Sequence, residues 1–190
     1  MVAMFDEVPA RLTADGAVGV LPTDTVYGLV ARVSDRAAVK RLYALKSREG
    51  KPGTIIAAGT AQLAELGLKA RYLKAVEQFW PGSVSVIIPC GPELEYLHEG
   101  VGSLAVRVPA EEPLHQLLQK TGPLLTSSAN HPGASIAVTV EQARQYFGDG
   151  ADFYIDGGDL SSRLPSTIIR IVDDAIEIIR EGAVKIQENE

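Results

Sequence analysis

The sequence is poor in cysteine and has no long apolar run. Cys90 is the only cysteine, which excludes a disulfide framework within the chain and a cysteine-based metal cluster. No apolar stretch approaches the roughly 18 residues that a membrane span needs. The first residues carry several charged side chains and Pro9, and they lack the apolar segment of a signal peptide. These absences predict a cytoplasmic protein without a membrane partner.

Positive charge is also scarce. The chain has 18 Lys and Arg residues against 24 Asp and Glu residues, so its formal net charge is -6. This balance argues against a protein that coats nucleic acid or binds acidic membranes, but it is compatible with a local basic pocket. With 190 residues, of which 46% are apolar, we expect a single domain over residues 1–190 with a sizeable core.

Several common motifs of catalysis and nucleotide binding are missing. The sequence has no phosphate loop, no glycine-rich dinucleotide fingerprint, no paired metal-binding histidines and no nucleophile elbow. Its histidines, His98, His115 and His131, lie far apart in the chain. A site in this protein would therefore be assembled from loops that are distant in sequence.

Short β-branched runs alternate with longer helical segments, which is typical of an α/β protein. The expected strands are Ala17–Leu21, Gly28–Val33, Thr54–Ala58, Ser83–Pro89, Ser103–Val108, Pro123–Ser127, Asp152–Ile155, Ser166–Val172 and Ala175–Arg180. The expected helices are Phe5–Asp15, Asp35–Leu45, Thr60–Leu66, Ala70–Trp80, Glu112–Lys120 and Thr139–Phe147. Because the last two strands read as a hairpin, we expect a mixed sheet that also contains parallel pairs.

Two polar segments in the first half of the chain follow apolar or helical stretches. Leu21 to Gly28 (L-P-T-D-T-V-Y-G) places hydroxyls and a carboxylate at a strand end, where α/β proteins bind ligands; an ordinary polar turn would look the same. Lys46-Ser47-Arg48, followed by Lys51-Pro52-Gly53, has the cations of an anion-binding loop or of a solvated helix end. If Lys46 and Arg48 serve one ligand, the helix should end near Leu45 and the trio should be extended, since residues i and i+2 share a face only on an extended chain.

Two more polar segments lie in the second half. Leu125 to Gly133 offers the side-chain donors and acceptors of Ser128 and Asn130, which suit phosphate oxygens or an adenine edge; a polar turn is the alternative. The fourth polar segment is Pro165 to Ile169, with Ile178 to Gly182 on the next strand. An ordinary hairpin with an exposed arginine is the alternative to a functional role for this pair.

In this order the segments resemble the YrdC/TsaC family of threonylcarbamoyl-AMP synthases, from about Ala17 to about Val184. The matching motifs are P-T-D-T-V-Y-G, K-x-R, F-W-P-G (Phe79–Gly82), A-V-R-V-P (Ala105–Pro109), S-x-N, D-G-G (Asp156–Gly158), S-T and I-I-R-x-G. The resemblance implies a YrdC-like α/β fold, in which a twisted open mixed sheet and its helices surround a concave electropositive cavity.

The family's activity is then the expected one. It is the condensation of L-threonine, bicarbonate and ATP to threonylcarbamoyl-AMP and pyrophosphate, a nucleotidyltransferase reaction in which ATP is a substrate and comes with Mg²⁺. The resemblance implies no resident metal site. It implies tRNA-modifying transferase proteins as partners, which complete N6-threonylcarbamoyladenosine in tRNA, and it is compatible with weak binding of tRNA itself.

The resemblance also assigns roles to residues. Lys46 and Arg48 match the catalytic pair. The matches to threonine-binding residues are Thr25, Ser103, Arg107 and Ser166. The matches to ATP-binding residues are Arg48, Lys51, Ser128, Asn130, Val138 and Arg180. We expect the cations of this set to converge on one cavity, with Gly50–Gly53 and Asp159–Pro165 as candidate lids.

The chain also departs from the family pattern. The stretch between Arg48 and Pro52 is shortened, Glu49 replaces a common proline, and Ser83 and Ser85 replace the usual Pro and Thr. Two other functions therefore stay open. One is a non-catalytic module that binds tRNA or double-stranded RNA, and the other is a YciO-type paralogue of unclear activity.

Overall fold

The structure is a computed structural model that describes residues 2–47, 50–173 and 175–186. Its strands form one nine-stranded sheet in the order β7-β1-β2-β6-β3-β5-β4-β8-β9. The strands are β1 (Val18–Pro22), β2 (Tyr27–Arg32), β3 (Thr54–Ile56), β4 (Val84–Pro89), β5 (Ser103–Arg107), β6 (Leu124–Ser128), β7 (Phe153–Tyr154), β8 (Thr167–Val172) and β9 (Ala175–Arg180). The sheet is mixed, because β1·β7, β3·β5 and β4·β8 pair in parallel and the other neighbours are antiparallel. The expected α/β class and the expected strands are confirmed.

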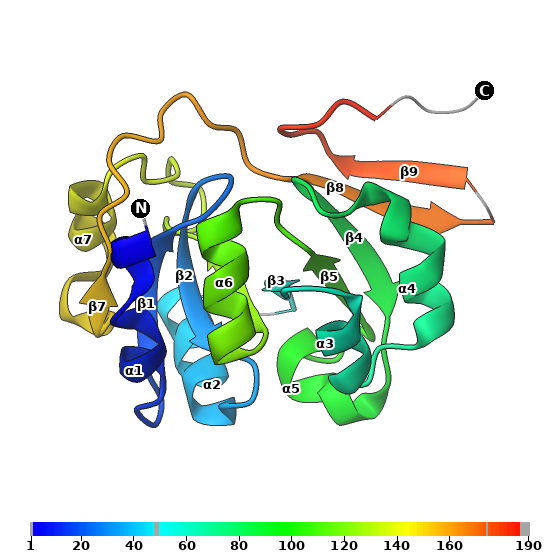
Figure 1. The fold of residues 1–190 in the computed structure, drawn as a ribbon, viewed down its shortest axis with the longest axis horizontal. Helices are drawn as coiled ribbons and strands as arrows, with labels where there is room; N and C mark the ends of the chain where they lie inside the picture. The colour runs from blue at the N-terminus through cyan, green and yellow to red at the C-terminus, as the bar shows by residue number, and fades with distance from the viewer. Residues whose placement is uncertain (1, 48–49, 174, 187–190) are drawn as a thin grey trace.

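Helices flank the sheet (Figure 1). They are α1 (Val8–Leu12), α2 (Arg36–Leu45), α3 (Thr60–Glu65), α4 (Ala70–Val76), α5 (Glu95–His98), α6 (Glu112–Thr121) and α7 (Val140–Phe147). Short 3-10 turns are Val2–Phe5, Glu77–Phe79, Pro92–Leu94 and Gly148–Gly150. Asp35 caps α2 by accepting a hydrogen bond from the Ala38 N–H, and Thr139 caps α7 in the same way from Gln142.

Two of the expected helices are shorter than the sequence suggested. The expected helix Phe5–Asp15 is only α1, because Pro9 lacks an N–H and therefore sits in the first turn of a helix rather than inside one. The expected helix Ala70–Trp80 ends at Val76 and continues as a 3-10 turn, since Pro81 disfavours helical geometry at the residue before it. The four-residue α5 was not expected.

The two faces of the sheet bury different sets of side chains. On one face Val18, Val20 and Leu29 pack with the apolar side of α2. On the other face Leu21 and Val30 pack in a smaller cluster with α1 and α6, and with two further strand residues, Ile56 and Leu124. In Figure 1, α1 and α6 accordingly lie beside each other over β1 and β2.

On this second face, the side chains of the strands beyond α6 are small or polar rather than apolar. Val30 pairs with Thr126, Thr126 with Thr54, and Thr54 with Ala105. Directly paired residues share a face, so the apolar cluster continues into a row of small or polar side chains. The chain between β7 and β8 crosses the top of the molecule above this region (Figure 1). We call residues 156–166 of this connection the strap.

Candidate functional site

A cavity of about 230 Å³ lies on the small-residue part of the sheet. All of the residues expected to bind threonine line it: Thr25, Ser103, Arg107 and Ser166. Arg180 and Ser128, from the expected ATP-binding set, line it as well. The structure thus brings together side chains that are more than a hundred positions apart in the sequence.

The cavity exists because its floor carries little side-chain volume. Thr54, Ala105 and Thr126 form adjacent positions on β3, β5 and β6 and all line the cavity. Gly28 lines it too, and a Cβ at this position would lie 2.6 Å from Thr126 Oγ1. The floor therefore tolerates neither a larger residue at position 28 nor long side chains on the central strands.

A buried ion pair stands at one wall of this cavity. Arg107 Nη1 lies 2.8 Å from Asp24 Oδ1 and 2.9 Å from Oδ2, and Ser83 Oγ donates to Oδ2 at 3.2 Å. The side chains of Arg107 and Asp24 are only 3% and 7% exposed. Burial lowers the pKa of the Arg107 guanidinium from its ordinary value, and the Asp24 carboxylate opposes that shift. The charge of Arg107 is therefore balanced within the wall.

The hydroxyl groups of the cavity are held by backbone and side-chain contacts. Thr23 Oγ1 accepts hydrogen bonds from the N–H groups of Thr25 and Val26, and it lies 3.0 Å from Thr25 Oγ1. Across the cavity Ser166 Oγ lies 2.9 Å from Ser85 Oγ. Arg180 donates through Nη2 to the Ser166 carbonyl oxygen at 2.6 Å and to its hydroxyl at 3.1 Å.

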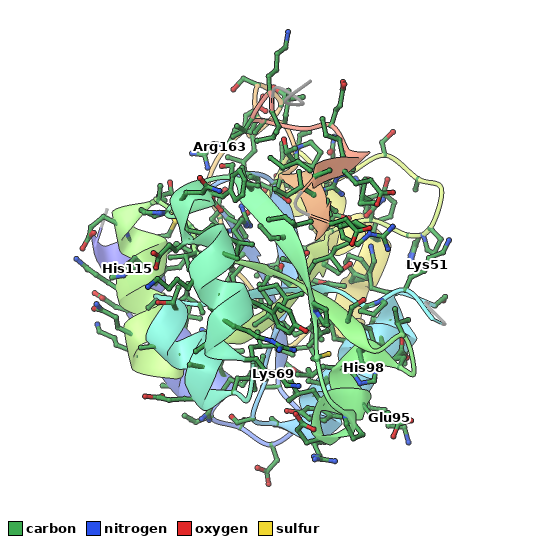
Figure 2. The ribbon with its side chains drawn as sticks, turned by 90° about the vertical axis from the view of Figure 1, so that its right-hand side faces the viewer. Lys51, Lys69, Glu95, His98, His115 and Arg163 are labelled. Carbon is green, nitrogen blue, oxygen red and sulfur yellow. The ribbon has the colours of Figure 1, made fainter. Side chains whose placement is uncertain are left out.

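A second hollow, of about 320 Å³, is lined by Lys46, Lys51, Ser128 and Asn130. Ser128 lines both hollows, so they adjoin there. Among the described cations of the expected set, Arg107 and Arg180 line the first cavity, and Lys46 and Lys51 line the second hollow. The expectation that they converge on one cavity needs correction, because the two pairs line two adjoining hollows. Lys51 projects outward from its loop at the edge of the molecule (Figure 2), while Lys46 is buried, at 2% exposure.

Lys46 connects the end of α2 to the loop after β6. Its ammonium donates to the Ser128 carbonyl oxygen at 2.6 Å, to Asn130 Oδ1 at 3.0 Å, and to the Asn130 carbonyl oxygen. Ser128 Oγ in turn donates to Asn130 Oδ1 at 2.7 Å. The S-x-N segment is thus organised around the lysine, and the interpretation of Lys46 as a solvated helix-end cation is wrong.

The expected backbone around Lys46 is confirmed only in part. Helix α2 ends at Leu45, as expected. Lys46, however, remains in the right-handed helical region, and Ser47 has a positive φ of 45°. The expectation of an extended trio is wrong at these two residues, because their N–H groups still bond to the helix carbonyls of Leu42 and Ala44. Arg48, and with it Glu49, lies outside the described residues.

The strap is attached to the rest of the site at several points. Tyr27, which is fully buried, accepts a hydrogen bond from the Gly157 N–H at 2.8 Å and donates to the Gly158 carbonyl oxygen at 2.9 Å. Burial raises the pKa of the Tyr27 phenol from its ordinary value, which keeps this donor protonated. Arg163, in the upper part of the view in Figure 2, donates to the Thr23 carbonyl oxygen at 2.7 Å.

The expected contact between Val138 and adenine stays a prediction. The Val138 N–H donates to Gln142 Oε1, and its carbonyl oxygen accepts from the Leu160 N–H of the strap at 2.8 Å. The candidate lid Gly50–Gly53 contributes Pro52 and Gly53 to the first cavity. The other candidate lid, Asp159–Pro165, contributes Pro165 to the same cavity.

The sequence interpretation missed several residues of this site. Asp24 and Thr23 lie inside the P-T-D-T motif, of which only Thr25 received a role. Ser85 was noticed only as a departure from the family, and Arg163 only as part of a loop. Each of them acts through another residue of the site, and such partners leave no local pattern in the sequence.

Comparison with known proteins gives a consistent picture. A profile of the Sua5/YciO/YrdC family, which carries the description "Telomere recombination", matches residues 11–182. The chain is 34% identical to the threonylcarbamoyl-AMP synthase of Pseudomonas aeruginosa over 175 residues, which are 90% of this chain and 94% of that protein. The structure is similar to that of Pyrococcus abyssi Sua5 in complex with L-threonine, with a TM-score of 0.81, 28% identity and coverage of 92% of this chain and 53% of that one. It is also similar to the structure of Escherichia coli YciO, with a TM-score of 0.82, 23% identity and coverage of 97% and 92%.

Proposed function

This chain belongs to the Sua5/YciO/YrdC family, and on that premise we propose that it is an L-threonylcarbamoyladenylate synthase. The observation that carries the proposal is the gathering of Thr25, Ser103, Arg107 and Ser166 around one cavity. A relative with this activity in its name shares 34% of its residues over nearly its whole length. The chain spans only about half of the Sua5 chain that is solved with L-threonine, so threonine enters here as part of the proposal.

The two adjoining hollows suit L-threonine and ATP, two of the three substrates of the proposed reaction. L-Threonine occupies the first cavity, where the hydroxyl groups of Thr25 and Ser166 are placed to recognise its side-chain hydroxyl. The triphosphate of ATP lies toward Lys46 and Lys51 in the second hollow. At the junction beside Ser128, the carbamate formed from threonine and bicarbonate attacks the α-phosphorus of ATP, and pyrophosphate leaves.

Charge stabilisation is the main task of the protein in such a step, because phosphoryl transfer asks for little covalent chemistry from side chains. The Lys46 ammonium is already buried and is held by the Ser128 carbonyl oxygen and by Asn130 Oδ1. Binding of ATP therefore requires no further loss of conformational entropy from this side chain. Arg48, Ser128, Asn130, Val138 and Arg180 keep their proposed ATP-binding roles. The enzyme class is nucleotidyltransferase.

Magnesium enters the proposal only as the ion that accompanies ATP. Within residues 2–47, 50–173 and 175–186 no group of three or more His, Cys, Asp or Glu side chains could hold a metal ion. Asp24 is engaged by Arg107 and Ser83.

The proposal also includes what happens to the product. Threonylcarbamoyl-AMP is passed to tRNA-modifying transferase proteins, and the chain itself binds tRNA weakly at most. The reaction takes place in the cytoplasm, and residues 1–190 form a single domain. No helix in the described part of the chain is long and apolar enough to cross a membrane. The similarity to YciO, at 23% identity, shows the fold alone and supports no second function.

The decisive experiment measures pyrophosphate release from ATP with each substrate omitted in turn. We expect release only when L-threonine and bicarbonate are both present, with threonylcarbamoyl-AMP as the product in mass spectrometry. ATP turnover that is equal without threonine, or no turnover over a range of Mg²⁺ concentrations, would refute the proposal. RNA binding that weakens steeply with salt in a protein without turnover would instead support the RNA-binding alternative.

A further inference from the structure

The contact between Asp24 and Arg107 is unusual in its geometry. Arginine and carboxylate groups commonly pair as two forks, in which two guanidinium nitrogens each donate to one carboxylate oxygen. Here a single nitrogen, Arg107 Nη1, reaches both oxygens of Asp24, at 2.8 and 2.9 Å. Asp24 therefore binds the guanidinium at one corner and does not use the edge formed by Nη2 and Nε.

That edge carries an unsatisfied donor. Arg107 Nε is buried and, within the part of the chain that the structure describes, has no hydrogen-bond partner. A buried donor without a partner is unfavourable, and an acceptor that arrives with a ligand would remove this cost. Arg107 lines the first cavity, and its Nη1 lies 3.5 Å from Thr25 Oγ1.

We propose that Asp24 is a positioning residue, which holds Arg107 so that its Nη2–Nε edge binds the α-carboxylate of the amino-acid substrate. The inference rests on the proposed function, since it takes the occupant of the first cavity to be an amino acid. A planar carboxylate matches the free edge of the guanidinium in shape and charge.

Asp24 also sets what kind of anion this wall accepts. The Asp24 carboxylate balances the charge of the Arg107 guanidinium, so the wall favours a single carboxylate over a polyphosphate. Ser83, which donates to Asp24 Oδ2 at 3.2 Å, gives the carboxylate a second support. The cavity thus separates the threonine carboxylate from the phosphates, which are left to the hollow of Lys46 and Lys51.

The test compares two ligands and two variants by titration calorimetry on the full chain. L-Threonine carries the carboxylate, and L-threoninol has a hydroxymethyl group in its place. We expect wild-type protein to bind threonine much more tightly than threoninol. In Asp24→Asn, which is nearly isosteric, threonine affinity should fall by at least about tenfold while threoninol affinity changes less than about twofold. The KM for ATP should stay within about twofold of the wild-type value.

The matched control is Asp152→Asn. Asp152 also pairs with an arginine, with Arg41 Nη1 at 2.6 Å from its Oδ2, but both side chains are more than a third exposed. This variant should keep the wild-type ratio of threonine to threoninol affinity. If Asp24→Asn does not fold, Ser83→Ala removes one support of the same carboxylate, and we expect a smaller loss that is again specific to threonine.

The outcomes separate the inference from the proposed function. An Asp24→Asn protein with an unchanged ratio, or equal losses for both ligands, overturns the positioning role. A Ser83→Ala protein with the wild-type ratio overturns it as well. Wild-type protein that makes no product from threonine refutes the proposed function itself.

Discussion

Replacement of Lys46 by methionine tests the centre of the site most directly. The substitution keeps an unbranched side chain of similar length but removes the ammonium, which donates to carbonyl oxygens of Ser128 and Asn130 and to the Asn130 side chain. We expect two losses, one in the rate of product formation and one in stability.

The magnitudes follow from these contacts. A fixed positive group at developing charge is typically worth roughly 10²–10³ in rate, so product formation should fall by about that factor. The substitution also strips a buried position of its donor, and each buried acceptor left without a partner costs about 1–3 kcal/mol. Partial relaxation of the loop brings the expected total to about 3 kcal/mol, or roughly 6–12 °C in melting temperature for a chain of this size.

The assay combines pyrophosphate release with thermal unfolding followed by circular dichroism. Lys40→Met is the matched control, because Lys40 lies on the same helix but is exposed, and it should leave both quantities close to wild type. Wild-type turnover in Lys46→Met would refute the catalytic role. An unchanged melting temperature would refute the idea that the lysine organises the loop after β6.

Three further predictions test other parts of the structure. Tyr27→Phe removes the hydroxyl between Gly157 and Gly158, so the free energy of unfolding in urea should fall by about 1–3 kcal/mol; no change would mean that the strap does not depend on this anchor. Ala105→Leu adds volume to the floor of a cavity of about 230 Å³, so calorimetry should detect no threonine binding at concentrations that saturate the wild type, and retained affinity would place threonine elsewhere. Burial raises the pKa of the Cys90 thiol to about 11, which leaves less thiolate at any pH below that value; iodoacetamide labelling at pH 8 should therefore run about 100-fold slower than for a free thiol and quicken as the pH rises toward 11, and rapid labelling at pH 8 would contradict it.

The sheet was predictable from the sequence because its strands carry their own signal. The run Ala17–Leu21 is apolar and lies between Gly16 and Pro22. The run Leu104–Val108 is apolar except for Arg107 and lies between Ser103 and Pro109. Helix lengths were less accurate, since prolines at positions 9 and 81 act on backbone geometry over only one or two residues. The short helix α5 offers too few residues for a periodic pattern.

The site was predictable where a residue belongs to an ordered motif, and much less so where it supports another residue. Thr25 and Arg107 were singled out and do line one cavity. The partnership of Arg107 with Asp24 depends on the loop between β1 and β2 meeting strand β5, which β6 and β3 separate from β2 in the sheet, and sequence spacing does not encode this order. The bend at Ser47 was also hidden, because a positive φ at serine has no sequence signature comparable to that of glycine.

The cavity draws its walls from strands spread along nearly the whole chain, from β2 near the start to β9 near the end. A contiguous fragment must span residues 23–180 to contain it, and the central strands that make its floor pair only after distant segments have met. Strand pairings between distant segments form slowly, because the entropy of closing long loops opposes them until the contacts are made. Ligand binding therefore requires the complete sheet, and a bound substrate stabilises the entire molecule against unfolding rather than one loop of it.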